Sequence, residues 1–152
     1  MENTPRGIVW ILVAAAAAIL SSANSLHGDY VIDDHSAVRT NGDLRPETPL
    51  RSLLTHDFWG RPLDAPMSNK SYRPLTVLSF RLNFVLHGLE VFGYHLGNVL
   101  LHAACTALVY VTCMQLLAPG DAVAARIASL AFAVHPVHAE AVTVFWSVCH
   151  PT

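Results

Sequence analysis

The sequence predicts an all-α membrane protein, and three observations carry this prediction. Hydrophobic residues make up 53% of the 152 residues and charged residues only 13%, about half the charged fraction that is typical of a soluble domain. The apolar residues occur in continuous blocks rather than in the alternating or heptad patterns of strands and coiled coils. Residues 91–117 contain no Asp, Glu, Lys or Arg. The net charge of -2 gives no indication of nucleic-acid binding.

Three apolar blocks, at residues 8–23, 91–117 and 122–134, are expected to form transmembrane helices. At a rise of about 1.5 Å per residue, the second block is long enough to cross a bilayer with some tilt. The third contains Arg126, whose long side chain can reach the membrane interface, and it stops at a His-Pro pair that disfavours helix. The turn at 118–121 joins the second and third blocks into a helical hairpin.

The first block has an alternative interpretation. It is short for a span, which needs roughly 20 apolar residues. Arg6 precedes it, and small residues, Ser21 and Ala23, follow it. This order is also typical of a cleaved signal peptide. Cleavage after Ala23 would leave a secreted or single-span protein.

The expected topology follows from Arg6, because a basic residue before the first span favours a cytosolic N-terminus. Residues 1–7 are then cytosolic, 24–90 luminal, 118–121 a cytosolic turn and 135–152 luminal. The long luminal segment carries seven of the nine basic residues. This does not contradict the positive-inside rule, since that rule counts short loops and long loops cross largely regardless of charge.

Two short amphipathic helices are expected within the luminal segment. The first begins with Thr48 as N-cap and Pro49 in the first helical position and ends at Gly60. The second runs from Pro74 to Gly88. The apolar side chains are Leu50, Leu53, Leu54 and Phe58 in the first, and Leu75, Leu78, Leu82, Val85 and Leu86 in the second. We expect both helices to lie in the membrane interface; packing against a soluble partner is the alternative.

Four polar residues follow one face of the second span, at His95, Asn98, His102 and Thr106. Polar side chains at membrane depth either line a cavity or join helices by hydrogen bonds, and the second role is the more common. No His or Cys spacing in the chain matches a zinc pattern, so no metal site is expected.

The acidic pair Asp33-Asp34 follows closely on the first apolar block. It can be a solvated turn, the start of a mature secreted protein, or a functional carboxylate pair at a membrane boundary. Only the rest of the chain can decide between these three.

Two further polar groups are candidates for binding. Lys70 and Arg73, here called the cation pair, could grip an anionic group such as a phosphate; contact with lipid headgroups is the alternative. His135, His138 and Glu140 form a compact acid/base group after the third block. Two histidines three residues apart with no third ligand are a weak metal signal.

These pieces occur in a specific order, which resembles the N-terminal part of the transmembrane and tetratricopeptide-repeat O-mannosyltransferases of the endoplasmic reticulum. The resemblance covers roughly Gly7 to Val142. The motifs that carry it are Asp33-Asp34, Phe58-Trp59-Gly60, the segment 68–76 around Ser71-Tyr72-Arg73-Pro74, the segment 93–102, and the segment 133–142 that contains His135-Pro136-Val137-His138-Ala139-Glu140.

The resemblance implies a multi-pass endoplasmic-reticulum glycosyltransferase of the GT-C type. Its donor would be dolichyl-phosphate mannose, with no cofactor, and its acceptor a Ser or Thr hydroxyl of a luminal, cadherin-type protein. An acidic residue of the pair would be the general base, with Asp34 preferred over Asp33. The cation pair would neutralise the leaving phosphate, and the His135, His138 and Glu140 group would line the same cavity.

The departures from the family are also informative. Its members are several times longer, no tetratricopeptide period appears here, and the likeness fades after Val142. Three spans cannot close a donor cavity, so we expect a truncated chain that is inactive alone. The alternative is a non-catalytic small membrane protein that acts in binding or assembly.

Overall fold

The computed structural model describes residues 5–30, 34–117, 122–138 and 142, and the regular structure within them is helical. This confirms the predicted all-α class; the described residues add only an isolated antiparallel bridge between His56 and Pro62. The chain divides into two compact units. The helical unit comprises the described residues of 1–28 and 95–152, and the loop unit comprises those of 29–94.

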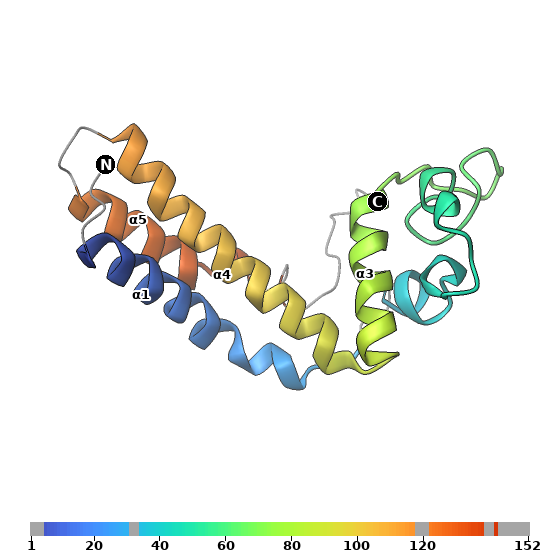
Figure 1. The fold of residues 1–152 in the computed structure, drawn as a ribbon, viewed down its shortest axis with the longest axis horizontal. Helices are drawn as coiled ribbons and strands as arrows, with labels where there is room; N and C mark the ends of the chain where they lie inside the picture. The colour runs from blue at the N-terminus through green and yellow to red at the C-terminus, as the bar shows by residue number, and fades with distance from the viewer. Residues whose placement is uncertain (1–4, 31–33, 118–121, 139–141, 143–152) are drawn as a thin grey trace. The chain divides into compact units, whose positions relative to one another are not determined.

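The described residues include four α-helices (Figure 1). They are α1 at Pro5–Ser22, α3 at Pro74–His87, α4 at Val91–Leu116 and α5 at Ala122–Val134. Shorter elements are the 3-10 helices Ala23–His27, Gly42–Leu44 and Leu50–Leu54, and a π-helical turn at His35–Arg39.

Two of these helices are long and apolar enough to cross a membrane. They are Pro5–His27, in which α1 continues into its 3-10 turn, and Val91–Leu116, with mean hydropathies of 1.9 and 1.7. The predicted third span does form a helix, α5, but it has only 13 residues. At about 1.5 Å per residue α5 is shorter than the roughly 30 Å hydrocarbon core, so a third transmembrane span stays a prediction.

Small side chains hold the helical unit together. Ala18 of α1, Ala103 of α4 and Ala133 of α5 form its buried cluster, and Figure 1 shows α1 and α5 side by side. Alanines allow helix backbones to approach closely, which is how helices pack in lipid, where burial of large apolar groups adds no driving force. The Arg126 guanidinium of α5 lies 4.7 Å from the Trp10 ring centre of α1, so the cation in α5 stacks on an aromatic face.

The polar face of α4 points into the helical unit. His95, His102 and Thr106 are buried, and Asn98 Nδ2 donates to the carbonyl of Val142 at 3.3 Å. Thr106 Oγ1 donates to the carbonyl of His102 at 2.9 Å. The bond of Asn98 to another segment favours the helix-joining interpretation for that residue.

Aromatic side chains form the centre of the loop unit. Phe80 of α3 lies between Phe58 and Tyr94, with ring centres 6.0 Å and 6.1 Å away in edge-on geometry. Tyr30 continues the chain of rings, 6.5 Å from Tyr94. Edge-to-face pairs at these distances add to the stability that burial alone provides.

The predicted helix from Thr48 to Gly60 is wrong. The structure has only a five-residue 3-10 helix at Leu50–Leu54, and Pro49 stands at its N-cap. Thr48 instead donates its hydroxyl to the carbonyl of Gly42 at 2.7 Å. Leu50 and Leu54, two of the predicted apolar stripe, are 62% and 64% exposed.

The hydrogen bonds of the Asp57 side chain explain why the helix does not continue to Gly60. Asp57 Oδ1 accepts the backbone N–H groups of Trp59 and Arg61 at 3.0 and 2.9 Å, and Oδ2 accepts the hydroxyl of Ser68 at 2.7 Å. An aspartate that binds nearby backbone N–H groups offers them an alternative to helix. The chain therefore turns where the apolar spacing predicted that it would continue.

The predicted second helix is confirmed as α3. Pro74 opens it, where its fixed φ suits the first turn and its missing N–H costs nothing. Gly88 caps it with φ +63°, a left-handed conformation that glycine adopts without strain. Its buried side includes Val77 and Phe80.

Candidate functional site

Asp34 is fully buried in the loop unit. It is the N-cap of the π-helical turn His35–Arg39, which Thr40 closes by donating its N–H to the carbonyl of His35 at 3.0 Å. π-Helical turns are rare and occur frequently at functional sites. A carboxylate is costly to bury, so its burial beside such a turn marks Asp34 as a functional candidate.

Three side chains near Asp34 were not predicted as site residues. Arg39 lies over the Tyr30 ring at 5.6 Å and its Nη1 donates to His35 Nε2 at 3.4 Å. The pKa of the Tyr30 hydroxyl is raised, chiefly by burial; Arg39 lowers it and the negative charge of Asp34 raises it further. Tyr30 therefore stays protonated and donates to the carbonyl of Leu89 at 2.7 Å. The i, i+4 spacing of His35 and Arg39 was the signal that could have revealed their contact.

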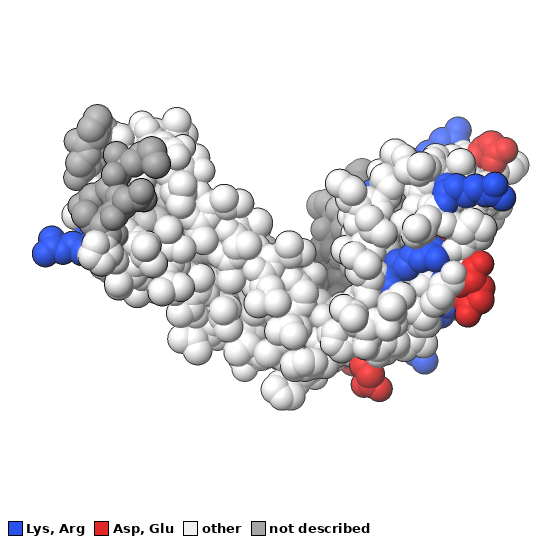
Figure 2. Space-filling view, viewed as in Figure 1, with Lys and Arg blue, Asp and Glu red and all other residues white. Residues whose placement is uncertain are grey.

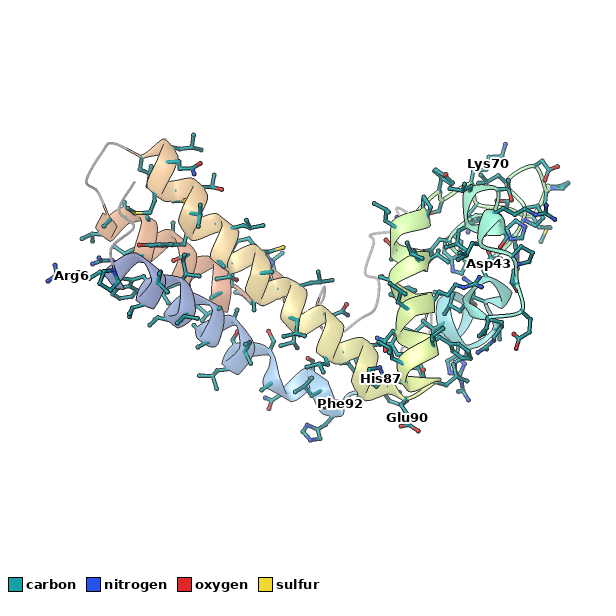
Figure 3. The ribbon with its side chains drawn as sticks, in the orientation of Figure 1. Arg6, Asp43, Lys70, His87, Glu90 and Phe92 are labelled. Carbon is teal, nitrogen blue, oxygen red and sulfur yellow. The ribbon has the colours of Figure 1, made fainter. Side chains whose placement is uncertain are left out.

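The cation pair lies in the same unit, on the segment that leads into α3. Lys70 is exposed and has φ +56°, a left-handed conformation that is uncommon for a residue with a side chain; Figure 3 shows its position. The Arg73 guanidinium lies 5.5 Å from the Phe58 ring centre. Partial burial lowers the pKa of Arg73, but an arginine remains charged at any physiological pH.

The helical unit contains a small pocket of about 70 Å³. The lining residues are Ser21, Ser22, His102, Ala133, Val134, His135, Pro136 and His138. The structure thus brings together the predicted residues His135 and His138. It adds His102, which the sequence indicated only as part of a polar helix face.

The three imidazoles of this pocket lie close together, and His138 contacts both of the others in tilted or edge-on geometry. The ring centre of His138 lies 5.1 Å from that of His102 and 6.1 Å from that of His135. Burial lowers the pKa of His138, and the neighbouring imidazoles of His102 and His135 lower it further. His138 is therefore neutral near pH 7, and can donate one hydrogen bond and accept another.

The volume and the ring geometry limit what this pocket can hold. Pockets that enclose whole ligands measure about 300–1,000 Å³, so this one is suited to water or a single functional group. Among the described residues no group of three His, Cys, Asp or Glu side chains is arranged to hold a metal ion. The pocket is suited to hydrogen bonding and proton transfer by neutral imidazole.

Two of the predicted site residues, Asp33 and Glu140, lie outside the described residues. Asp34, Lys70 and Arg73 belong to the loop unit, whereas His135 and His138 belong to the helical unit. The candidate site consequently has two parts, an acidic turn and a histidine pocket, each defined within its own unit.

The fold and these two parts define a class: an α-helical chain with two membrane-length apolar helices and buried polar groups. Comparison with known proteins identifies the relatives of this chain. The chain is 46% identical over 160 residues to protein O-mannosyl-transferase Tmtc3 of Drosophila melanogaster, a match that covers 93% of this chain. It is 50% identical over 120 residues to the human protein O-mannosyl-transferase TMTC3, and 44% identical over 143 residues to human TMTC4, which cover 79% and 86% of it.

The chain is therefore homologous to the TMTC protein O-mannosyl-transferases, and the predicted resemblance is confirmed. It spans only 17% of the Drosophila Tmtc3 length, 13% of human TMTC3 and 19% of human TMTC4. No family model matches the chain, and no solved structure matches it.

Proposed function

We propose that this chain supplies the base-bearing N-terminal region of a GT-C-type protein O-mannosyl-transferase in the endoplasmic-reticulum membrane. The donor is dolichyl-phosphate mannose, and the acceptor is a Ser or Thr hydroxyl of a luminal, cadherin-type protein. The observation that supports this most is the burial of Asp34 in a chain homologous to enzymes named for O-mannosyl transfer. A carboxylate that the fold takes out of water suits a proton acceptor better than a solvated turn.

The proposed reaction is a single displacement. The acceptor hydroxyl oxygen forms a bond to C1 of mannose while the bond from C1 to the phosphate oxygen breaks, and the configuration at C1 inverts. The hydroxyl proton passes to the carboxylate of Asp34, or of its neighbour Asp33, because an alcohol is a poor nucleophile until a base takes its proton. The bonding electron pair leaves with dolichyl phosphate.

The developing negative charge on the phosphate needs a fixed positive partner. Lys70 and Arg73 are the candidates, since a guanidinium and an ammonium both stabilise a leaving phosphate. The pocket of His102, His135 and His138, with Glu140 nearby in sequence, would supply hydrogen bonds to the substrate.

The test uses a chimera, because the chain spans under a fifth of the length of these relatives. The chain replaces the homologous segment of human TMTC3, and mannose transfer to a cadherin domain is measured in microsomes from cells that lack the endogenous enzymes. We expect the chimera to transfer mannose and the isolated chain to be inactive. A stable, membrane-inserted chimera without activity would argue against the proposal and for a binding or assembly role.

A further inference from the structure

The α3 helix has three different sides. Val77, Phe80 and Arg81 are buried against the loop unit. A second side is polar and carries Thr76, Ser79, Asn83 and His87. The third is apolar, at a spacing that keeps its members on one face of a helix with 3.6 residues per turn; its residues are Leu75, Leu78, Leu82, Val85 and Leu86.

The apolar side of α3 is exposed. Leu75 and Leu86 are 80% and 75% exposed, and Leu82 and Val85 are 59% and 62% exposed. Single exposed leucines are common on soluble proteins, but a continuous apolar face marks a surface that something else covers. A helix facing water would carry polar residues on its open side.

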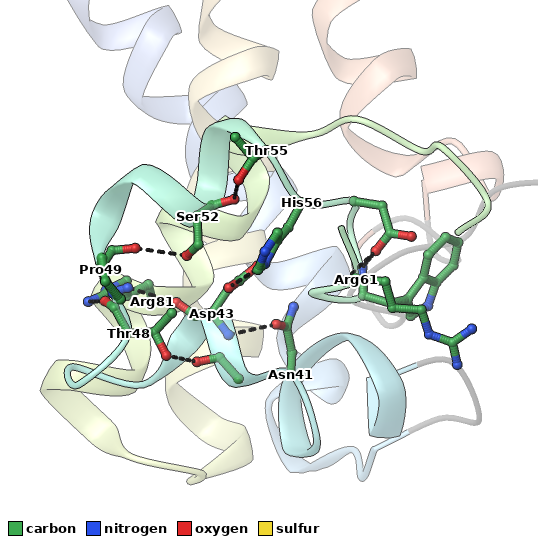
Figure 4. Close-up of polar contacts among 12 residues, drawn as sticks. Asn41, Asp43, Thr48, Pro49, Ser52, Thr55, His56, Arg61 and Arg81 are labelled. Carbon is green, nitrogen blue, oxygen red and sulfur yellow. Dashed lines mark hydrogen bonds and ion pairs between the residues drawn. The ribbon is translucent and has the colours of Figure 1, made fainter. Parts of the chain in front are cut away.

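The one formal charge of α3 is turned inward. Arg81 is buried and donates through Nη1 to the carbonyl of Asp43 at 2.9 Å, and through Nη2 to those of Pro46 and Thr48 at 3.2 and 2.7 Å. The guanidinium thereby ties down the loop that α3 packs on (Figure 4). It leaves the two open sides of α3 without Lys, Arg, Asp or Glu.

These observations favour the lipid bilayer as the partner that covers the apolar side of α3. After α3 ends at His87, α4 begins at Val91, and Figure 3 shows His87, Glu90 and Phe92 around this junction. Since α4 is long and apolar enough to cross a membrane, the short link tethers α3 close to any bilayer that α4 spans.

Two arginines lie beside α3, where they could contact lipid headgroups. Arg73 is its N-cap residue, and the Arg45 guanidinium lies 4.3 Å from the ring centre of Phe84. Cations at the edge of an apolar face suit phosphate headgroups. Figure 2 shows that charged residues gather on the loop unit in this view.

We propose that α3 lies in the membrane interface, with Leu75, Leu82 and Leu86 in the acyl-chain boundary and the Asn83 side toward water and headgroups. This assigns a lipid-binding surface that does not depend on the mannosyl-transfer proposal. If a second copy of the chain or a further protein segment covered the same face, these leucines would contact protein instead of lipid.

The test compares neighbouring positions on different sides of α3. In the 152-residue chain with Cys105, Cys113 and Cys149 replaced by Ser, Leu82→Cys and its matched control Asn83→Cys are each labelled with a small fluorophore. The labelled chains are reconstituted in phosphatidylcholine vesicles, with brominated acyl chains as the lipid quencher and iodide as the aqueous quencher. Leu75→Cys and Thr76→Cys provide a second pair if either first variant fails to insert.

We expect several-fold stronger quenching by brominated lipid at Leu82 than at Asn83, and the opposite order for iodide. Equal iodide quenching at both positions would overturn the proposal, because the face would then be in water. Protection of Leu82 from both quenchers would also overturn it, since protein would then cover the face. Loss of that protection at low protein-to-lipid ratio would identify a second copy as the cover.

Discussion

The Nε2 atom of His102 on α4 lies 3.1 Å from the carbonyl oxygen of Ala133 at the end of α5. Because a carbonyl only accepts, this nitrogen carries the imidazole proton. The same carbonyl accepts the hydroxyl of Ser21 on α1 at 2.9 Å. One backbone oxygen therefore joins three helices at the wall of the histidine pocket.

The first prediction concerns these two donors. Ser21→Ala and His102→Phe should each destabilise the chain by about 0.6–1.7 kcal/mol, which lies between the average and the largest value measured for hydrogen bonds between membrane helices. The double variant should lose more than the sum, because the Ala133 carbonyl is then left without either donor in a buried site. Unfolding in detergent, followed by circular dichroism, measures each value.

The neighbouring variant Ser22→Ala is the control for this cycle, since it leaves the Ser21 bond in place. Strict additivity in the double variant would show that Ser21 and His102 do not share one acceptor.

The second prediction is a pH dependence from His138. Its folded-state pKa lies below the ordinary value of 6.5 through burial and its two histidine neighbours. The unfolded chain thus binds a proton more readily, so stability is complete above about pH 7 and falls as the pH drops through 6.5 toward the folded pKa.

Urea or thermal unfolding between pH 5 and pH 8 measures this loss. His138→Gln should flatten the curve, because it removes the titrating group and keeps a hydrogen-bonding side chain. A His138→Gln curve that falls as steeply as that of the parent chain would assign the effect to another group.

The third prediction concerns Gly60. Its φ is +79°, and a Cβ at this position would collide with Asn41 Oδ1. Asn41 cannot move without cost, since its Nδ2 donates to the carbonyl of Phe58 at 3.0 Å and its Oδ1 accepts the N–H of Asp43 at 2.9 Å. Gly60→Ala should destabilise the chain by about 1–3 kcal/mol. Gly42→Ala is the matched control, since a Cβ there meets only open space; equal melting temperatures for the two variants would refute this account of the loop.

How much the sequence could predict differs between the helices and the loop. Hydropathy located α1, α4 and α5 to within a few residues, because apolar blocks this long rarely form anything other than buried or membrane helices. Pro74 and Gly88 marked the ends of α3, because each has a specific backbone conformation. The helix predicted up to Gly60 failed because the Asp57 carboxylate captures nearby N–H groups, a contact that apolar spacing does not reveal.

The candidate site was predictable only in part, for a similar reason. Residues close in sequence, such as His135 and His138, were recognised as a group. His102 is distant from them in sequence, and only the packing of α4 on α5 brings it to their pocket. Tyr30 and Arg39 were missed because their importance lies in their contact near Asp34.

The fourth prediction tests the expected topology. Asn69 is exposed and begins the sequon Asn69-Lys70-Ser71. If the loop unit faces the lumen, the chain expressed in microsomes should carry a glycan there, and its gel mobility should shift after glycosidase treatment. Asn69→Gln is the control and should abolish the shift. Protease cleavage of the loop in sealed microsomes would contradict a luminal location.

The most direct test of the central claim is mannose transfer by the chimera with human TMTC3, with Asp34→Asn compared with Asp29→Asn. Both changes replace a carboxylate by an amide within six residues of sequence, but Asp34 is buried and Asp29 is exposed. A general base contributes about 10²–10⁴-fold to a rate, so Asp34→Asn should lose at least about 100-fold in turnover while Asp29→Asn retains the parent rate. An Asp34→Asn chimera that inserts normally and transfers mannose at the parent rate would contradict the assignment of Asp34 as the base, and the same measurement on Asp33→Asn would then show whether its neighbour has that role.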